Sequence, residues 1–274
     1  MEIMRGNIRK MKASAATPIT YALPLGNDEL PLNALLGKTL RLEFTGQITC
    51  NGCGQATKKS FGEGFCYRCF TTLAQCDLCI VKPELCHFAK GTCREPEWGL
   101  THCMQPHYVY LANASGLKVG ITRATQIPTR WMDQGAVQAL PVLKVQSRYQ
   151  AGLVEVALKQ HVSDRTDWRK MLKGEPELQD LPMQRGDLFS RCEPALAQIG
   201  GGKGTEVLSI LEQEPVRAFS YPVLQYPTRV TALNLEKTPR VEGALLGIKG
   251  QYLILDTGVL NVRKFTGYQV AVSA

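Results

Sequence analysis

Apolar and polar residues alternate along both ends of the chain, as they do in strands with one buried face. Near the N-terminus the runs GNIRKM, ITYALPL and KTLRLEFTGQI predict strands, and in the third run Leu40, Leu42 and Phe44 share one face. Near the C-terminus the runs VEGALLGIKG, QYLILDTG and VLNVRKFTGYQVAV predict hairpins with intervening glycines. No long linker follows or precedes these runs, so we expect the two ends to meet in one discontinuous β domain.

The centre of the chain mixes the periods of strands and helices. Two short apolar runs, YVYL and KVGI, flank a polar turn and predict paired strands. A short helix, QIPTRWMDQG, follows with Pro128 near its first turn. The run ALPVLKVQS then predicts a strand, and RYQAGLVEVALKQHVS predicts a helix with apolar residues at helical spacing. The predicted order is therefore strand, strand, helix, strand, helix.

The next segment is harder to interpret. DLFSRCEPALAQIG predicts a helix, the run Gly200-Gly201-Gly202 predicts a flexible break, and TEVLSILEQE fits either a helix or a strand. The whole pattern predicts an α+β protein, divided into an N-terminal β segment, a cysteine-rich module, a small α/β domain, a helical connector and a C-terminal β segment, at residues 1–49, 50–106, 107–173, 174–214 and 215–274.

Composition narrows the class of protein. A chain of 274 residues with 44% hydrophobic content can build a sizeable core. No apolar run reaches the ~18 to 20 residues that cross a bilayer, and the basic start MEIMRGNIRKMK has no apolar signal core behind it. We therefore expect a cytoplasmic protein with no membrane partner. The formal charge of +8 makes nucleic acid an expected partner, and the oligomeric state stays open.

Nine of the ten cysteines fall between Cys50 and Cys103, mostly in close pairs. In a reducing cytosol this pattern indicates metal binding rather than disulfides. The first group has the spacing C-x2-C-x12-C-x2-C, in which two tight turns aim two thiolates each at one point, and consists of Cys50, Cys53, Cys66 and Cys69. Four thiolates at ~2.3 Å form the tetrahedral cage that Zn²⁺ prefers, so we expect a zinc-ribbon-like structural site.

A second group contains one thiol more than a closed site needs. Its members are Cys76, Cys79, Cys86, Cys93 and Cys103, with His87, His102 and His107 nearby. We expect four of the five cysteines to bind one ion, the best choice being the first three with Cys93 or Cys103. Zinc is the favoured metal, and an iron–sulfur cluster is the alternative. The histidines are expected to be ordinary packed or surface residues.

The central segment from about Tyr108 to Val162 resembles the GIY-YIG nuclease superfamily. YVY stands in the place of the first motif and KVG in that of the second, the short helix offers Arg130, and the second helix offers Glu155. The sequence departs from the superfamily at Lys118, which replaces the second tyrosine. The chain as a whole, with its cysteine segment followed by KVGIT, RWMDQGA and GIKGQYL, also resembles an uncharacterised bacterial family of unknown function.

The first resemblance implies an endonuclease site. Tyr110 would activate or orient the attacking water, Arg130 would contact the scissile phosphate, and Glu155 would hold one Mg²⁺ or Mn²⁺. Gly120 would allow close approach of the substrate to the backbone. Arg123 and Arg148 would add phosphate contacts.

Lys118 becomes an effective proton-transfer group near neutral pH only if its pKa is lowered. The residues also allow simpler roles, since Tyr110 could be a packed aromatic side chain and Glu155 could pair with Lys159 on the helix surface. Three functions remain open: a metal-dependent phosphodiester hydrolase with structural zinc, a zinc-containing DNA- or RNA-binding protein without catalysis, and a metal-organised scaffold for a protein partner.

Overall fold

The computed structural model of the chain describes residues 4–200 and 208–274. Helices and several sheets are both present, so the predicted α+β class is confirmed. The chain forms two compact units. Unit 1 consists of residues 1–71, 172–174 and 219–274, and unit 2 consists of residues 72–171 and 175–218. Two predicted features lie partly outside the described residues. They are the flexible break, at Gly201 and Gly202, and the first three residues of TEVLSILEQE, for which either a helix or a strand was predicted.

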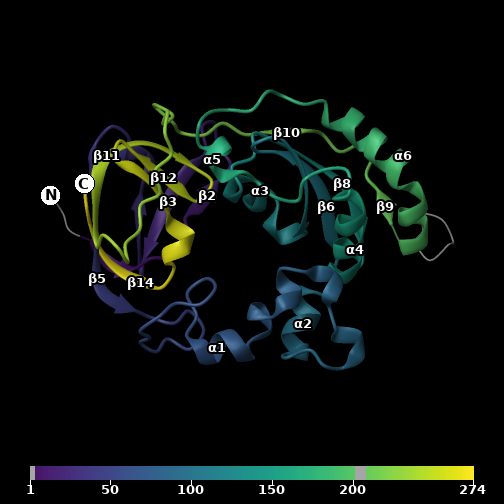
Figure 1. The fold of residues 1–274 in the computed structure, drawn as a ribbon, viewed down its shortest axis with the longest axis horizontal. Coiled ribbons are helices and arrows are strands. Elements are labelled where there is room, and N and C mark those ends of the chain that lie inside the picture. The colour runs from purple at the N-terminus through teal and green to yellow at the C-terminus, as the bar shows by residue number, and fades with distance from the viewer. Residues whose placement is uncertain (1–3, 201–207) are drawn as a thin grey trace. The chain divides into compact units, whose positions relative to one another are not determined.

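Strands from the two ends of the chain share one antiparallel sheet in unit 1. The sheet has the order β1-β14-β5-β11-β12-β13, in which β14 pairs with β1 on one side and β5 on the other. Figure 1 shows the dark β5 between strands of the yellow C-terminal segment. The bounds are Met4–Asn7 (β1), Thr39–Ile48 (β5), Arg240–Lys249 (β11), Tyr252–Leu255 (β12), Gly258–Asn261 (β13) and Tyr268–Ser273 (β14).

Alternation along these strands builds the core of unit 1. Leu40 and Leu42 are fully buried, and Phe44, two residues further on, packs its ring 5.0 Å from that of Tyr268. A smaller antiparallel sheet, β2-β3-β4, completes the unit. Its strands are Lys12–Ser14 (β2), Thr20–Leu25 (β3) and Asp28–Pro31 (β4); the helical elements of the unit are Asn33–Leu35 (η1), Tyr67–Thr72 (α1) and Val262–Phe265 (η7).

Lys249, at the end of β11, is fully buried in unit 1. Its ammonium group donates a hydrogen bond of 2.9 Å to the carbonyl oxygen of Gly174 and lies 5.5 Å and 5.1 Å from the ring centres of Tyr221 and Tyr226. A buried cation needs such partners, because the loss of its water shell is otherwise uncompensated. This anchor ties the short segment 172–174 to unit 1.

Unit 2 is built on a second antiparallel sheet of the order β10-β8-β6-β7, with β9 also paired to β8. Its strands are His107–Asn113 (β6), Leu117–Arg123 (β7), Gln138–Val145 (β8), Ser209–Ile210 (β9) and Arg217–Ala218 (β10). Its α-helices are Pro96–His102 (α2), Thr129–Asp133 (α3), Arg148–Leu158 (α4), Trp168–Met171 (α5) and Leu181–Ile199 (α6). The elements β6, β7, α3, β8 and α4 follow one another in the predicted order.

The two faces of this sheet carry different neighbours. Val109 and Leu111 of β6 point into an apolar core with residues of α4 and α6. The residue between them, Tyr110, points to the other face, where its ring meets Trp131 of α3 at 5.9 Å. Figure 1 shows α4 and α6 on one side of β6 and β8, and α3 on the other. Strand period two therefore decides which side chains reach the α3 face.

Several predicted bounds differ from those in the structure. The run GNIRKM is not one strand, because β1 ends at Asn7 and Ile8 then forms an isolated bridge with Leu25 of β3. The second helix ends at Leu158 rather than Ser163, because the carbonyl of Ser163 accepts a hydrogen bond from Val119 on the edge strand β7. β10 lies within the predicted C-terminal β segment, yet it pairs with β8 in unit 2.

Candidate functional site

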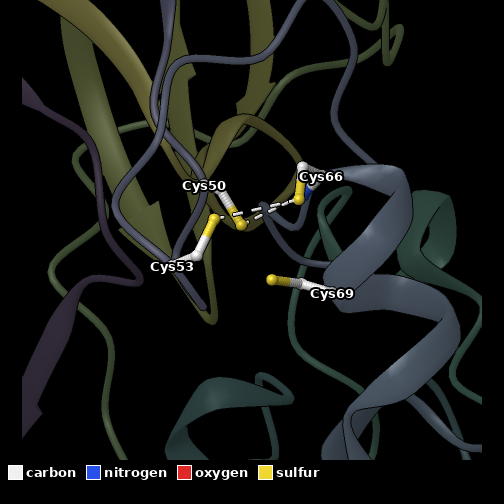
Figure 2. Close-up of side chains that lie close together, drawn as sticks. All are labelled: Cys50, Cys53, Cys66 and Cys69. Atoms are coloured by element: carbon white, nitrogen blue, oxygen red, sulfur yellow. Dashed lines mark hydrogen bonds between the residues drawn. The ribbon is translucent and has the colours of Figure 1, made fainter.

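Four thiols of unit 1 converge on one point. Cys50 and Cys53 lie in the turn after β5, and Cys66 and Cys69 lie just before and within α1. The four sulfur atoms all lie within 4.8 Å of one another, and those of Cys53 and Cys66 are 3.9 Å apart. Figure 2 shows the four side chains directed toward a common centre. This is the group that the C-x2-C-x12-C-x2-C spacing predicted, and it could hold a metal ion.

Backbone amides near the four thiols stabilise a negative charge on the sulfur of Cys50. The sulfur of Cys50 accepts hydrogen bonds from the amides of Gly52 at 3.3 Å and Cys66 at 3.1 Å. Burial alone would raise the pKa of Cys50. The hydrogen bonds that backbone amides donate to its sulfur have the larger combined effect and lower the pKa to about 6. Burial and its thiol neighbours raise the pKa of Cys69 to about 12. A cation at the centre would remove this repulsion, and the all-sulfur donor set is consistent with zinc.

The second cysteine group lies in unit 2. None of the ten cysteines forms a disulfide. A cavity of about 10 Å³ is lined by four thiols of the group, those of Cys79, Cys86, Cys93 and Cys103, and Cys76 is not among its lining residues. The best choice from the sequence included Cys76, and the choice of four ligands among the five cysteines stays a prediction.

The three nearby histidines have separate environments. His87 faces Asp77 with its Nε2 at 3.5 Å from the carboxylate, and its Nδ1 lies 2.8 Å from Thr92 Oγ1. The ring of His102 stacks on Trp98 at 4.2 Å. His107 is fully buried, and burial lowers its pKa to about 4, so its ring is neutral near pH 7. His102 and His107 are packed residues, as expected.

Tyr110 and Gly120 lie directly opposite each other in the β6–β7 pair. A Cβ at residue 120 would lie 2.6 Å from the hydroxyl oxygen of Tyr110, so only glycine leaves room for this ring. The glycine thus makes room for the Tyr110 ring, and the close approach of a substrate expected at Gly120 stays a prediction. The Tyr110 hydroxyl donates a hydrogen bond of 2.8 Å to Gln134 Oε1 just after α3.

Lys118, Arg130 and Glu155 lie within electrostatic reach of one another around this tyrosine. Arg130 both hydrogen-bonds to Tyr110 and lowers the pKa of Lys118, whereas Glu155 raises the pKa of both Tyr110 and Lys118. Lys118 shares the sheet face of Tyr110 at the edge strand β7. The structure therefore brings together the four side chains that the sequence singled out.

Burial brings two of these groups close to neutrality. Desolvation is the largest cause that lowers the pKa of Lys118 to about 7, and the Arg130 charge adds to it. Desolvation, followed by the charge of Asp164, raises the pKa of Glu155 to about 7. The condition under which a lysine could replace a tyrosine as a proton-transfer group is therefore met. Groups with pKa values shifted toward neutral pH gather at functional sites.

The two additional arginines differ in their surroundings. Arg123 is partly exposed at the end of β7. Arg148 donates a hydrogen bond of 2.5 Å from Nη2 to the carbonyl oxygen of Ile80, and its backbone amide donates to Cys103 at 2.8 Å. Arg148 thus lies beside the second cysteine group and also within electrostatic reach of Arg130 and Glu155, and the phosphate contact expected of it stays a prediction.

Two residues of the cluster were not singled out from the sequence. Asp164 is an exposed carboxylate that acts on both Glu155 and Lys118, and Gln134 accepts the Tyr110 hydrogen bond. Asp164 follows α4 in a turn, where no periodic pattern marks its direction. The sequence signal that could have pointed to Asp164 was its position as a second acidic residue a short distance after Glu155.

The sequence comparisons place this chain in a family. A model of the family described as "Protein of unknown function (DUF2797)" matches residues 37–270, and the chain belongs to this family. Comparison with curated proteins and with solved structures returned no match. No helix in the described part of the chain is both long and apolar enough to cross a membrane.

Proposed function

We propose that unit 2 carries a divalent-metal-dependent phosphodiester hydrolase site that acts on nucleic acid, in the manner of the GIY-YIG nuclease superfamily. The observation that carries the proposal is the convergence of Tyr110, Lys118, Arg130 and Glu155 with Asp164 nearby. A lysine and a carboxylate with pKa values near 7, next to an arginine, match the needs of phosphodiester hydrolysis.

The residues divide the chemistry as follows. The Arg130 guanidinium contacts the phosphate and stabilises the charge that grows on its oxygens. The neutral amine of Lys118 accepts a proton from the attacking water as the new P–O bond forms and the P–O bond to the leaving oxygen breaks. The leaving oxygen then takes up a proton from solvent. Tyr110, which is fully buried, acts as a positioning residue that holds Arg130 and Gln134.

Glu155 and Asp164 supply carboxylate oxygens of the kind that Mg²⁺ and Mn²⁺ bind. Such an ion, when bound, supplies Lewis-acid stabilisation of the reacting phosphate. Its charge would also favour the ionised form of Glu155, which burial otherwise disfavours.

A nicking assay tests the proposal. The full chain is incubated with Mg²⁺ or Mn²⁺ and with plasmid, single-stranded DNA or RNA, and we expect Glu155→Ala to lower the cleavage rate by about 10²-fold or more. Gln160→Ala is the matched control, because Gln160 is exposed just after the same helix and uncharged. Absence of cleavage of every substrate by the wild type, or equal rates for wild type and Glu155→Ala, would refute the assignment.

Binding without cleavage is the second candidate function. The low exposure of Lys118, at 3%, favours it, because a closed site gives a reacting phosphate little access. The two functions separate in one experiment: a protein that only binds retains its affinity for nucleic acid in Glu155→Ala and cuts none of the substrates with any of the added metals.

A further inference from the structure

The second cysteine group lies in a segment with little regular structure. Four short turns connect α1 to α2 and the following strand: Ala74–Cys76 (η2), Leu78–Ile80 (η3), Pro83–Leu85 (η4) and Phe88–Lys90 (η5). Few of its apolar side chains are buried, and Leu78, Val81 and Leu85 are exposed. A segment without its own apolar core needs another source of stability, and bound metal is a common one.

Four cysteines from separate turns line one small cavity in this segment. Cys79 lies in η3, Cys86 and Cys93 follow η4 and η5, and Cys103 follows α2. The charges of Cys86 and Cys103 act on Cys79, and those of Cys86 and Cys93 act on Cys103, so the thiols lie near one another around the cavity, at a wider spacing than the four thiols of unit 1. The cavity volume of about 10 Å³ has room for about one water-sized particle. That space suits a single ion.

Asp77, Cys79 and His87 form a competing group, since their ligand atoms lie within 4.8 Å of one another. The Asp77 carboxylate already has other partners. It accepts a hydrogen bond from the Cys79 amide at 3.3 Å and pairs with Arg94 Nε at 2.7 Å. Asp77 therefore shapes the turn that presents Cys79, and its charge is already neutralised by Arg94.

A cation at the edge of the cavity adds an independent observation. The Arg148 side chain acts electrostatically on Cys103 and Cys79, and its Nε is buried without a hydrogen-bond partner among the described residues. A buried donor without a partner is costly. Metal-bound thiolates carry net negative charge and accept hydrogen bonds, so a filled site would compensate both the charge and the donor of Arg148.

We propose that Cys79, Cys86, Cys93 and Cys103 bind one structural zinc ion, with Cys76 outside the site. The ion fixes the turns on which α4 rests. Gly152 of α4 lies so close to η4 that a Cβ there would be 2.5 Å from Pro83 Cβ and 2.6 Å from the amide nitrogen of Glu84. Arg148, at the start of the same helix, donates hydrogen bonds from its side chain to the carbonyl oxygen of Ile80, next to Cys79, and from its backbone amide to the carbonyl oxygen of Cys103.

The metal content of the full chain tests this ligand set. We expect Cys86→Ser/Cys93→Ser to hold one zinc ion fewer per chain than the wild type by elemental mass spectrometry. Cys76→Ser and His87→Ala should retain the wild-type content, and Cys50→Ser/Cys53→Ser should lose the ion of unit 1 instead. Loss of an ion in Cys76→Ser or His87→Ala, or an unchanged content in Cys86→Ser/Cys93→Ser, would overturn the proposal.

A second measurement uses only the wild type, in case the double variant fails to fold. Cys76, Cys79, Cys86 and Cys93 are all of intermediate exposure, so burial alone predicts similar reaction with iodoacetamide. We expect Cys76 to be alkylated and the other three to be protected until a chelator is added. Hydrogen exchange of residues 148–158 should then become faster, because α4 loses its support. Equal alkylation of all four thiols before chelation would contradict the site.

Discussion

Lys118 is the proton-transfer group of the mechanism that we propose. The residue stands on an edge strand, is almost fully buried, and has its pKa lowered to about 7 by burial and by Arg130. In water a lysine holds its proton at neutral pH, whereas here a large fraction of the amines is neutral. An arginine in the same place would keep the charge and could not release the proton.

We therefore expect Lys118→Arg to bind nucleic acid and to cut it about 10² to 10⁴-fold more slowly than the wild type. The wild-type rate should rise as pH passes about 7, because the active state needs Glu155 ionised and Lys118 neutral, and both require loss of a proton. Cleavage and binding are measured from pH 5.5 to 9. Cleavage by Lys118→Arg at the wild-type rate would remove Lys118 from proton transfer.

The residues of the site could be predicted from the sequence as far as strand geometry reaches. Tyr110, Lys118 and Gly120 lie on one sheet face because the turn fixes the register and period two fixes the face. Asp164 could not be predicted, because its direction depends on where α4 ends. The burial of Lys118, and with it the shift of its pKa, also depends on packing that one sequence does not reveal.

At the scale of elements, the β6–β7 pair and α3 form one packed arrangement. Tyr110 fills the space that Gly120 leaves, packs against Trp131 and donates its hydrogen bond to Gln134. A side chain at residue 120 cannot be added without moving the ring. The position of Arg130, which hydrogen-bonds to the same tyrosine, then changes as well.

We expect Gly120→Ala to lower the free energy of unfolding by about 1 to 3 kcal/mol, the usual cost of overpacking. Gly186→Ala is the matched control, since Gly186 lies in α6 with nothing within 4 Å of its Cβ position and should gain up to ~1 kcal/mol from helix propensity. Urea unfolding of both variants gives the comparison. Equal stability of Gly120→Ala and the wild type would show that the Tyr110 ring can move at little cost.

Element existence was easier to predict than element ends. The α4 pattern predicted a helix correctly, but its last turn is replaced by a segment whose Ser163 carbonyl bonds to β7. The edge strand β7 has backbone groups that form hydrogen bonds with this segment in place of a further helical turn. Helical periodicity in the sequence does not show that such an edge lies nearby. The pairing of the terminal strands could be predicted because both ends show the same alternation and would otherwise leave apolar faces exposed.

At the scale of the whole molecule, the formal charge of +8 supports an anionic partner, and nucleic acid is the partner that we propose. If phosphate contacts dominate binding, affinity must fall as salt rises, because bound cations are released from the nucleic acid.

We expect the dissociation constant for DNA or RNA to increase by about 10-fold or more between 50 and 200 mM salt, as a few phosphate contacts would require. Arg130→Ala should weaken binding further and reduce the salt slope by about 1. Arg191→Ala serves as the control, because Arg191 is exposed on α6 and paired with Asp187. Fluorescence anisotropy measures all three proteins, and an affinity that does not change with salt would argue against any nucleic-acid partner.

The strand order of unit 1 has a consequence for synthesis on the ribosome. β5 lies between β14 and β11, and both of these neighbours come from the last 35 residues of the chain. During translation β5 therefore emerges long before either partner, whereas unit 2 is complete once residue 218 has been made. The apolar side chains Leu40 and Leu42 of β5 therefore lack their final neighbours in the sheet while all of unit 2 is being synthesised. Unit 1 can therefore close only after β11 and β14 have been made, and until then the apolar face of β5 is exposed to aggregation.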